Sequence, residues 1–253
     1  MQHPLRRFIQ SGLSYFGYSV NRSSKSALAV QKQLLSQRQR PVIFDVGANV
    51  GKMTKEYRRA FPSAVIHAFE PFPASFASLR EHAAIGTNTF AHQLALTNRA
   101  GICLFNCNVK AETNSLLATD PRYTDAWESG WLETQEQIEV QTGMIDGFCS
   151  EHAIPAIDLL KMDIQGAEML ALDGAKAMLS RQAISLIYME IIIASAYQGQ
   201  PALSDYLDYM HGINYHLFDF YNQSRRDLQL VEVDALFVSS SFSSELPRSS
   251  RPK

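Results

Sequence analysis

A glycine loop placed directly after an apolar run constrains this chain more than any other feature. Residues 42–44 are typical of a buried strand, residues 45–51 follow as Asp-Val-Gly-Ala-Asn-Val-Gly, and residues 52–60 predict a helix. A glycine-rich turn between a strand and a helix lets a ligand approach the backbone closely. Asn49 stands where a dinucleotide fingerprint needs its second glycine, which disfavours NAD, and no Gly-Lys-Ser/Thr of a P-loop is present. The loop therefore favours a ligand without phosphate groups.

The alternation of strands and helices continues along the chain. Because strand–helix–strand units make right-handed crossovers, this order predicts an α/β fold with a mostly parallel sheet and helices on both faces. The expected closing strands at 215–218 and 235–238 are antiparallel. The remaining predicted elements are strands at 65–69, 90–94, 157–162 and 184–189, and helices at 73–84, 167–179 and 201–210.

Three further segments complete the predicted organisation. Residues 1–40 form an N-terminal helical extension that ends near Arg40, and its first 17 residues carry one apolar stripe. That stripe packs on the domain, or makes a homodimer contact, or touches a membrane surface weakly. Residues 41–238 form the main domain, with an insertion at about 101–145. Residues 239–253 are rich in serine and are expected to be a disordered tail.

Composition narrows the functional classes. A chain of 253 residues is one large domain or at most two small ones, and its net charge of −2 argues against binding to nucleic acid. Three cysteines without a CxxC motif argue against a structural zinc site. No apolar run is long enough for an integral membrane span, and we expect a cytoplasmic protein. His67 and His92 fall on predicted strands and are expected to be satisfied core residues.

Acidic residues end the first two predicted strands. Asp45 ends the first strand and can face an ammonium group, while Glu70 ends the second and can accept hydrogen bonds from both ribose hydroxyls. An amino-acid group, a ribose and no phosphate together describe S-adenosylmethionine. Pro71, directly after Glu70, and Gln93, at the end of the third strand, complete the expected cofactor site. A tight turn without a ligand is the alternative for the glycines.

A second group of charged residues lies at the end of the strand at 157–162. Lys161 and Asp163 are two residues apart, so they share one face of that strand. Asp163 falls at the carboxyl end of the sheet, where open α/β sheets bind ligands. A lysine in such an apolar strand needs a partner, and the candidates are Asp163, Glu168 and Glu190. A purely structural salt-bridge network is the alternative.

These segments together resemble the FkbM family of S-adenosylmethionine-dependent methyltransferases. The resemblance is carried by residues 45–51, by Phe-Glu-Pro at 69–71, by Asn-Ser-Leu at 114–116 and by Lys-Met-Asp-Ile-Gln-Gly-Ala-Glu at 161–168. It covers about residues 41–238 and implies a Rossmann-like seven-stranded sheet of the class I methyltransferase type. It also implies O-methylation of a hydroxyl group on a sugar, a glycan or a natural product.

The resemblance also assigns residues to roles, with one departure. It suggests active-site roles for Lys161, Asp163 and Glu168, and the family usually has an acid where this chain has Gln165. Because an amide can neither act as a base nor supply a charged metal ligand, this member is altered or inactive if the chemistry runs through that acid. Cofactor binding is carried onto Asp45, Gly47, Asn49, Gly51 and Glu70.

Transfer to a hydroxyl requires a base in reach, because an alcohol barely ionises at neutral pH. Asp163 is the first choice for that base. A divalent ion held by Asp163 and Glu190 is the second choice and is not expected. The rival functions are an N-methyltransferase on the same fold and a cofactor-binding partner protein that has lost its chemistry.

The insertion is predicted to form a lid over the acceptor. Trp127 and Trp131 are four residues apart, so on a helix they share one face, and aromatic faces stack on sugars or flat apolar rings. Asn114, Ser115 and Glu190 are the other expected substrate contacts. Six acids and one base lie between residues 120 and 139, which favours a neutral or cationic acceptor over a phosphorylated one. The alternative is that both tryptophans belong to the core.

Overall fold

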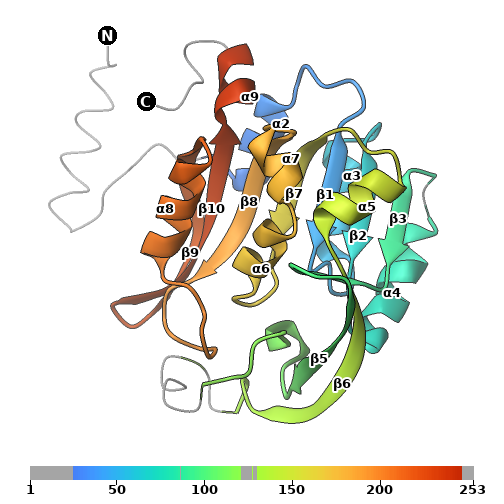
Figure 1. Cartoon of the computed structure of the whole chain (residues 1–253). Helices are drawn as coiled ribbons and strands as arrows, with labels where there is room; N and C mark the ends of the chain where they lie inside the picture. Colours follow the sequence, from blue (N-terminus) through green and yellow to red (C-terminus); the bar gives the residue numbers. More distant parts are fainter. Residues whose placement is uncertain (1–24, 86, 121–126, 128–129, 247–253) are drawn as a thin grey trace, which may run out of the picture.

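In the computed structural model, residues 25–85, 87–120, 127 and 130–246 are described. A seven-stranded sheet in the order β3-β2-β1-β7-β8-β10-β9 forms the centre of the molecule (Figure 1). The first five of these strands pair in parallel, and β10 is antiparallel to both of its neighbours. The predicted α/β class and the antiparallel closing strands are therefore confirmed. The strands are β1 (Val42–Val46), β2 (Val65–Phe69), β3 (Thr89–His92), β7 (Ile157–Met162), β8 (Ile184–Ile192), β9 (Tyr215–Arg226) and β10 (Gln229–Ser239).

Helices cover both faces of this sheet because successive strand residues point to opposite sides. On β1, Phe44 and Val46 pack into a core with α5 to α8, whereas Ile43 packs into a second core with α2, α3 and α9. Figure 1 shows these helices on either side of the strands. The helices are α2 (Ala27–Leu34), α3 (Lys52–Ala60), α4 (Pro73–Ala83), α5 (Ile145–Glu151), α6 (Glu168–Asp173), α7 (Lys176–Ser180), α8 (Leu203–Gly212) and α9 (Ser240–Glu245).

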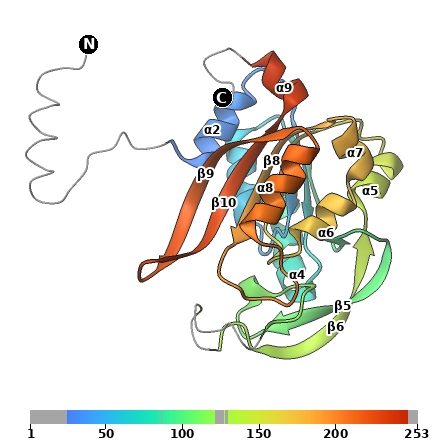
Figure 2. The same ribbon diagram turned by 60° about the vertical axis from the view of Figure 1, so that its left-hand side comes forward.

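The predicted insertion supplies two of the three strands of a second, smaller sheet. Its order is β4-β6-β5, from β4 (Ala95–Leu96), β6 (Thr134–Gly143) and β5 (Gly101–Asn108), and a short 3₁₀ helix η1 (Ala111–Thr113) follows β5. The strands β5 and β6 pair antiparallel with each other along most of their length. Figure 2 shows β5 and β6 beyond the carboxyl ends of the parallel strands. The small sheet therefore covers the edge at which a ligand would bind.

Several predicted boundaries are wrong, and three of them change the organisation of the chain. The helix expected over 167–179 is divided into α6 and α7 near Gly174, where an added Cβ atom would lie 2.1 Å from the Thr97 carbonyl oxygen. The tail is not wholly disordered, because α9 begins directly after β10 and buries Phe242 and Leu246 against α2. In the N-terminal extension, the helix ends at Leu34 and not near Arg40.

Parts of the chain ends lie outside the described residues. The apolar stripe before Gly17 and the tail from residue 247 belong to these parts, so both remain predictions. No helix in the ranges described is long and apolar enough to cross a membrane.

Candidate active site

The glycine loop turns at the end of β1 in close contact with the end of β7. Gly47 has a φ of +71°, and a Cβ atom placed on it would lie 1.9 Å from the Asp163 carbonyl oxygen. The amides of Gly47 and Ala48 both donate to the Phe69 carbonyl oxygen at 3.0 Å. The close contact with the end of β7 therefore requires glycine at position 47. The sequence suggested another reason, the close approach of a ligand.

A buried lysine joins the strand ends under this loop. Lys161 Nζ lies 3.1 Å from Asp45 Oδ1 and 3.7 Å from Asp163 Oδ2, and it donates to Gly47 O at 3.0 Å. Burial favours the neutral amine, but the charges of Asp45 and Asp163 outweigh it and raise the pKa of Lys161. Asp163 was among the predicted partners of Lys161, whereas the shorter ion pair, to Asp45, was not predicted.

Glu70 forms the opposite wall of the loop. Its Oε2 accepts a hydrogen bond from the Asn49 amide at 2.9 Å, and its Oε1 accepts one from the Phe72 amide at 2.8 Å. Burial raises the pKa of Glu70 to about 7, against the opposing effect of these two amides. The carboxyl group is thus fixed in place, with its remaining lone pairs free to accept hydrogen bonds.

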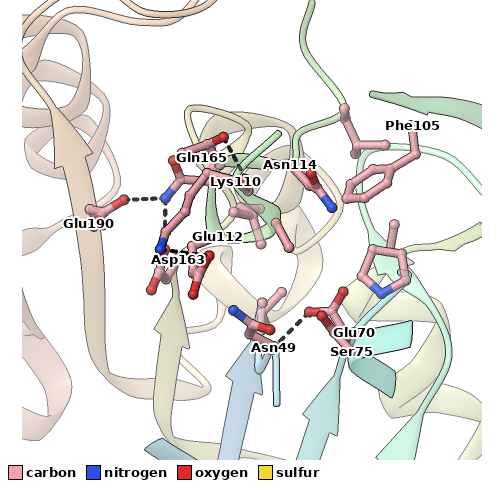
Figure 3. Close-up of a pocket in the computed structure, with 18 of the residues that line it drawn as sticks. Asn49, Glu70, Ser75, Phe105, Lys110, Glu112, Asn114, Asp163, Gln165 and Glu190 are labelled. Atoms are coloured by element: carbon pink, nitrogen blue, oxygen red, sulfur yellow. Dashed lines mark hydrogen bonds and ion pairs between the residues drawn. The ribbon is translucent and has the colours of Figure 1, made fainter. Parts of the chain in front are cut away.

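Gln165 lies at the centre of a second cluster of polar side chains, apart from the one around Glu70. Its Nε2 donates to Glu190 Oε2 at 2.7 Å and to Asp163 Oδ1 at 3.1 Å, as Figure 3 shows. Its Oε1 lies 3.1 Å from the hydroxyl of Tyr197, and its backbone oxygen accepts a hydrogen bond from Ser115 Oγ at 2.8 Å. The amide of Gln165 therefore bridges two carboxylates.

One cavity of about 300 Å³ connects Glu70 to the Gln165 group. Asn49, Glu70, Asp163, Gln165 and Glu190 face one another across it in Figure 3. The cavity brings together most of the residues predicted for cofactor and substrate. These are Gly47, Asn49, Glu70, Pro71, Asn114, Trp127, Trp131, Asp163 and Glu190.

Six predicted site residues do not line this cavity. The Asp45 side chain is fully buried between Lys161 and Thr54, whose hydroxyl donates to it at 2.6 Å. The prediction that Asp45 faces the ammonium group of a ligand is therefore wrong for this structure, because the ammonium group that it contacts belongs to Lys161. Lys161 itself lies behind the loop. Gly51 begins α3, and a Cβ atom there would lie 3.0 Å from Leu79 Cδ1. The remaining three are Gln93, Ser115 and Glu168.

These three residues have other surroundings. Gln93 is exposed after β3, and Ser115 is buried under Gln165. Glu168 is buried at the start of α6, where it accepts hydrogen bonds from the Ile164 amide at 2.9 Å and the Tyr206 hydroxyl at 3.1 Å. Burial raises the pKa of Glu168 to about 7. Lys161 and Glu168 therefore lie behind the cavity and are not part of its lining.

The two tryptophans line the cavity, but not from a helix. Trp127 lies in a bend and Trp131 in a turn. Lys110 Nζ lies 5.2 Å from the centroid of the Trp131 ring, a distance at which a cation is attracted to an aromatic face. The prediction that Trp127 and Trp131 share one site is therefore confirmed, whereas the prediction that a helix brings them together is wrong.

Several residues that line the cavity are not predicted from the sequence. The lining residues Lys110, Glu112 and Thr113 come from η1 and the segment before it, where no recognisable motif is present. Glu232 comes from β10, and here a signal exists, because an acid between Val231 and Val233 is unusual in a buried strand. The cavity is also lined by Ser75, Leu94, Ala95, Leu96, Phe105 and Leu116.

The arrangement does not fit a divalent ion at Asp163 and Glu190. The amide nitrogen of Gln165 donates to both carboxylates and lies where a bridging cation would bind. The described parts of the chain contain no group of three or more His, Cys, Asp or Glu side chains arranged to hold a metal ion.

Comparison with known proteins identifies the family. A family model described as "Methyltransferase FkbM domain" matches residues 45–217. The chain belongs to the FkbM methyltransferase family. It is therefore a methyltransferase, as the resemblance implied, and its seven-stranded, mostly parallel sheet is the Rossmann-like fold expected for such an enzyme.

The relatives of this chain include two proteins described as methyltransferases. The 2-O-methyltransferase NoeI of Sinorhizobium fredii (strain NBRC 101917 / NGR234) is 30% identical over 207 residues, which cover 79% of this chain and 84% of that protein. The 31-O-demethyl-FK506 methyltransferase FkbM of Streptomyces tacrolimicus is 29% identical over 157 residues, or 53% of this chain and 59% of that protein. An rRNA methylase structure from Streptococcus thermophilus matches with a TM-score of 0.49 and 9% identity, covering 88% of this chain and 99% of that one.

Proposed function

We propose that this protein transfers the methyl group of S-adenosylmethionine to a hydroxyl oxygen of a neutral sugar, glycan or natural product. One observation carries the proposal. A single cavity joins Glu70, an acceptor suited to ribose hydroxyls, to the Asp163–Gln165–Glu190 group beside two tryptophans. The relatives described as 2-O-methyltransferase and 31-O-demethyl-FK506 methyltransferase support oxygen as the acceptor atom.

The residues around Glu70 fit the cofactor. Glu70 is held by two backbone amides with lone pairs remaining, so ribose hydroxyls can donate to it. Pro71, Leu94, Leu96 and Phe105 supply apolar surface suited to an adenine ring. When bound, the cofactor supplies a methyl group that is already activated on a sulfonium. The protein then contributes orientation, which can lower the barrier by several kcal/mol.

Asp163 replaces Asp45 as the carboxylate facing the cationic part of the cofactor. Asp45 is enclosed by Lys161 and Thr54, whereas the side chain of Asp163 is 42% exposed and lines the cavity next to Gly47. A cation near Asp163 would gain an electrostatic attraction that Lys161 only partly offsets from 3.7 Å. We therefore assign Asp163 to cofactor orientation.

The charge of the cavity favours a neutral acceptor. Among the described residues, its lining contains the carboxyl groups of Glu70, Glu112, Asp163, Glu190 and Glu232 and one cationic side chain, Lys110. A phosphorylated acceptor would meet like charges in a partly dehydrated space, which is unfavourable. Trp127 and Trp131 offer flat faces for the C–H surface of a sugar or for an apolar ring.

The direct test uses isotopically labelled S-adenosylmethionine and a panel of neutral glycosides, hydroxylated natural products, sugar phosphates and amines. We expect label on a hydroxyl oxygen of a neutral acceptor, identified by mass spectrometry. Small molecules that change by one methyl group in a deletion strain would supply the native candidates for the panel. Label on nitrogen only would overturn the proposal in favour of an N-methyltransferase. Tight cofactor binding without turnover of any acceptor would favour a binding partner without catalysis.

A further inference from the structure

Four carboxyl groups lie at the carboxyl end of the sheet, and two of them contact the amide of Gln165. Glu190 and Asp234 are register partners on β8 and β10, and Glu232 lines the same cavity. Gln165 Nε2 contacts Glu190 at 2.7 Å and the fourth carboxylate, Asp163, at 3.1 Å (Figure 3). Neighbouring negative charges and burial both disfavour ionisation of Glu190.

We propose that Glu190 takes the proton of the acceptor hydroxyl, that Gln165 positions it, and that entry of the cationic cofactor ionises Glu190 for this step. The assignment rests on the proposed function, because it presupposes a hydroxyl acceptor and a sulfonium donor. It replaces Asp163, which the sequence favoured as the base.

The two candidate carboxylates differ in their contacts. Lys161 lies 3.7 Å from Asp163 Oδ2, whereas no Lys or Arg in the described part of the chain forms an ion pair with Glu190. The hydrogen bond to Glu190 comes from Gln165, a neutral amide. Burial, followed by the negative charge of Asp163, raises the pKa of Glu190 well above its usual range. A carboxyl group in such surroundings accepts a proton at neutral pH more readily than an ordinary one.

Among the described residues, the titratable groups that act on Glu190 come from several elements, and one of them is a cation. That cation, Lys161, has its short contacts with Asp45, Gly47 and Asp163. Without a further positive charge, the surroundings therefore favour the protonated form of Glu190. The facing groups are Lys161 and Asp163 from β7 and its end, Glu168 from α6, Tyr197 from the segment after β8, Tyr206 from α8, and Glu232 and Asp234 from β10.

The chemical step balances with Glu190 as the base. The acceptor oxygen forms its bond to the methyl carbon while the carbon–sulfur bond breaks and its electron pair stays on sulfur. The hydroxyl proton passes to the Glu190 carboxylate. A cation and an anion thereby become a neutral thioether and a neutral carboxylic acid, so no net charge is left in the buried cavity.

This charge balance predicts that cofactor binding is coupled to the release of a proton from Glu190. The coupling can be measured without the acceptor. S-adenosylmethionine carries a positive sulfur, which favours the ionised form of Glu190, whereas the sulfur of S-adenosylhomocysteine is neutral. Binding of the first ligand should therefore release more protons than binding of the second. Any proton released from Glu70 by the shared ribose is the same for both ligands and cancels in the difference.

The experiment is calorimetric titration of the full chain with each ligand, in pairs of buffers with different ionisation enthalpies, between about pH 6 and pH 8.5. For the wild type we expect S-adenosylmethionine to release on the order of half a proton more than S-adenosylhomocysteine at the most sensitive pH. The difference should disappear in Glu190→Gln. It should persist in Glu112→Gln, which removes an exposed carboxylate of the same cavity.

Gln165→Met tests the positioning role separately. Loss of the amide donor removes a hydrogen bond that favours the charged form of Glu190, so the pH of maximal difference should move upward. A residue needed only for folding would not move that pH.

The outcomes separate the two proposals. A wild type that binds both ligands without a difference in proton release would overturn the inference, as would a difference that survives in Glu190→Gln. A wild type that binds neither ligand would overturn the proposed function itself. If Glu190→Gln does not fold, the test rests on two measurements. These are the difference in proton release between the two ligands in the wild type, and the shift in the pH of its maximum in Gln165→Met.

Discussion

Lys161 and Asp45 are register partners on β7 and β1, and their charged atoms lie 3.1 Å apart. Both side chains are almost completely buried, with 6% and 0% of their surfaces exposed. The same ammonium donates to the Gly47 carbonyl oxygen, so one cation ties two central strands to the glycine loop. This pair therefore holds the strand ends and the glycine loop together, and neither side chain lines the cavity.

Lys161→Met should destabilise the fold strongly, because it leaves the Asp45 carboxylate buried without a cation. We expect the free energy of unfolding to fall by ~3–5 kcal/mol in urea denaturation. Lys176→Met, which removes an exposed ion pair with Asp173, should cost less than ~1 kcal/mol. Addition of Asp45→Asn to Lys161→Met should recover part of the loss. Equal effects of the two lysine substitutions would contradict the structural role of Lys161.

Gly47→Ala should abolish cofactor binding and lower stability by more than ~2 kcal/mol, because the new Cβ atom meets the Asp163 carbonyl oxygen. Gly199→Ala is a matched control with a φ of +72° and nothing within 4 Å of its Cβ position. It should cost ~1 kcal/mol from backbone strain alone and leave cofactor affinity unchanged. Calorimetry and thermal melts of both variants measure the contrast. Tight cofactor binding by Gly47→Ala would show that the ligand does not use this loop.

Glu70 should make cofactor affinity depend on pH. Burial raises its pKa to about 7, and ribose hydroxyls donate best to the ionised form. S-adenosylhomocysteine should therefore bind more weakly as the pH falls below about 7, because the carboxyl group must first lose its proton. Glu70→Gln should weaken binding by ~1–3 kcal/mol at pH 8 and flatten this dependence. Unchanged affinity in a folded variant would refute the ribose assignment.

Trp127→Ala and Trp131→Ala should impair acceptor binding and spare the cofactor. Each removes an aromatic face from the cavity wall, which should raise the acceptor KM about tenfold, or ~1–2 kcal/mol. Trp131→Phe keeps a ring at that position and should restore most of the affinity. The measurements are steady-state kinetics with the acceptor and calorimetry with S-adenosylhomocysteine. Lower melting temperatures with unchanged kinetics would instead assign both tryptophans to the core.

His67 and His92 should make the fold sensitive to acid. His67 Nδ1 lies 3.1 Å from His92 Nε2, and burial lowers the pKa of both rings to about 4. The unfolded chain takes up protons at these residues below about pH 6.5, so their stabilising effect is complete above that pH and is lost toward pH 4. His92→Phe should therefore lose less stability than the wild type between pH 7 and pH 5. The exposed His211→Gln should behave like the wild type, and thermal melts across this range would show the difference.

The sequence alone determined the architecture and the place of the site, because both depend on local rules. Apolar runs separated by amphipathic segments predict alternating strands and helices, and a glycine loop after the first strand marks its carboxyl end. Glu70 was identifiable for the same reason, since it follows the second strand directly. The antiparallel closing strands were predictable too, although their lengths were not, because β9 and β10 extend each other by pairing.

Only the tertiary structure decided which polar groups meet. Asp45 and Lys161 are distant in sequence, and only the parallel register of β1 and β7 makes them partners. The sequence suggested that Gln165 stands in place of a functional acid. The positions of β7 and β8 put its amide between two carboxylates, to which it donates hydrogen bonds. Glu232 reaches the cavity because β10 pairs with β8 in one particular register. Strand order and register are set by the packing of the whole sheet, so contacts across strands are not determined by any single segment.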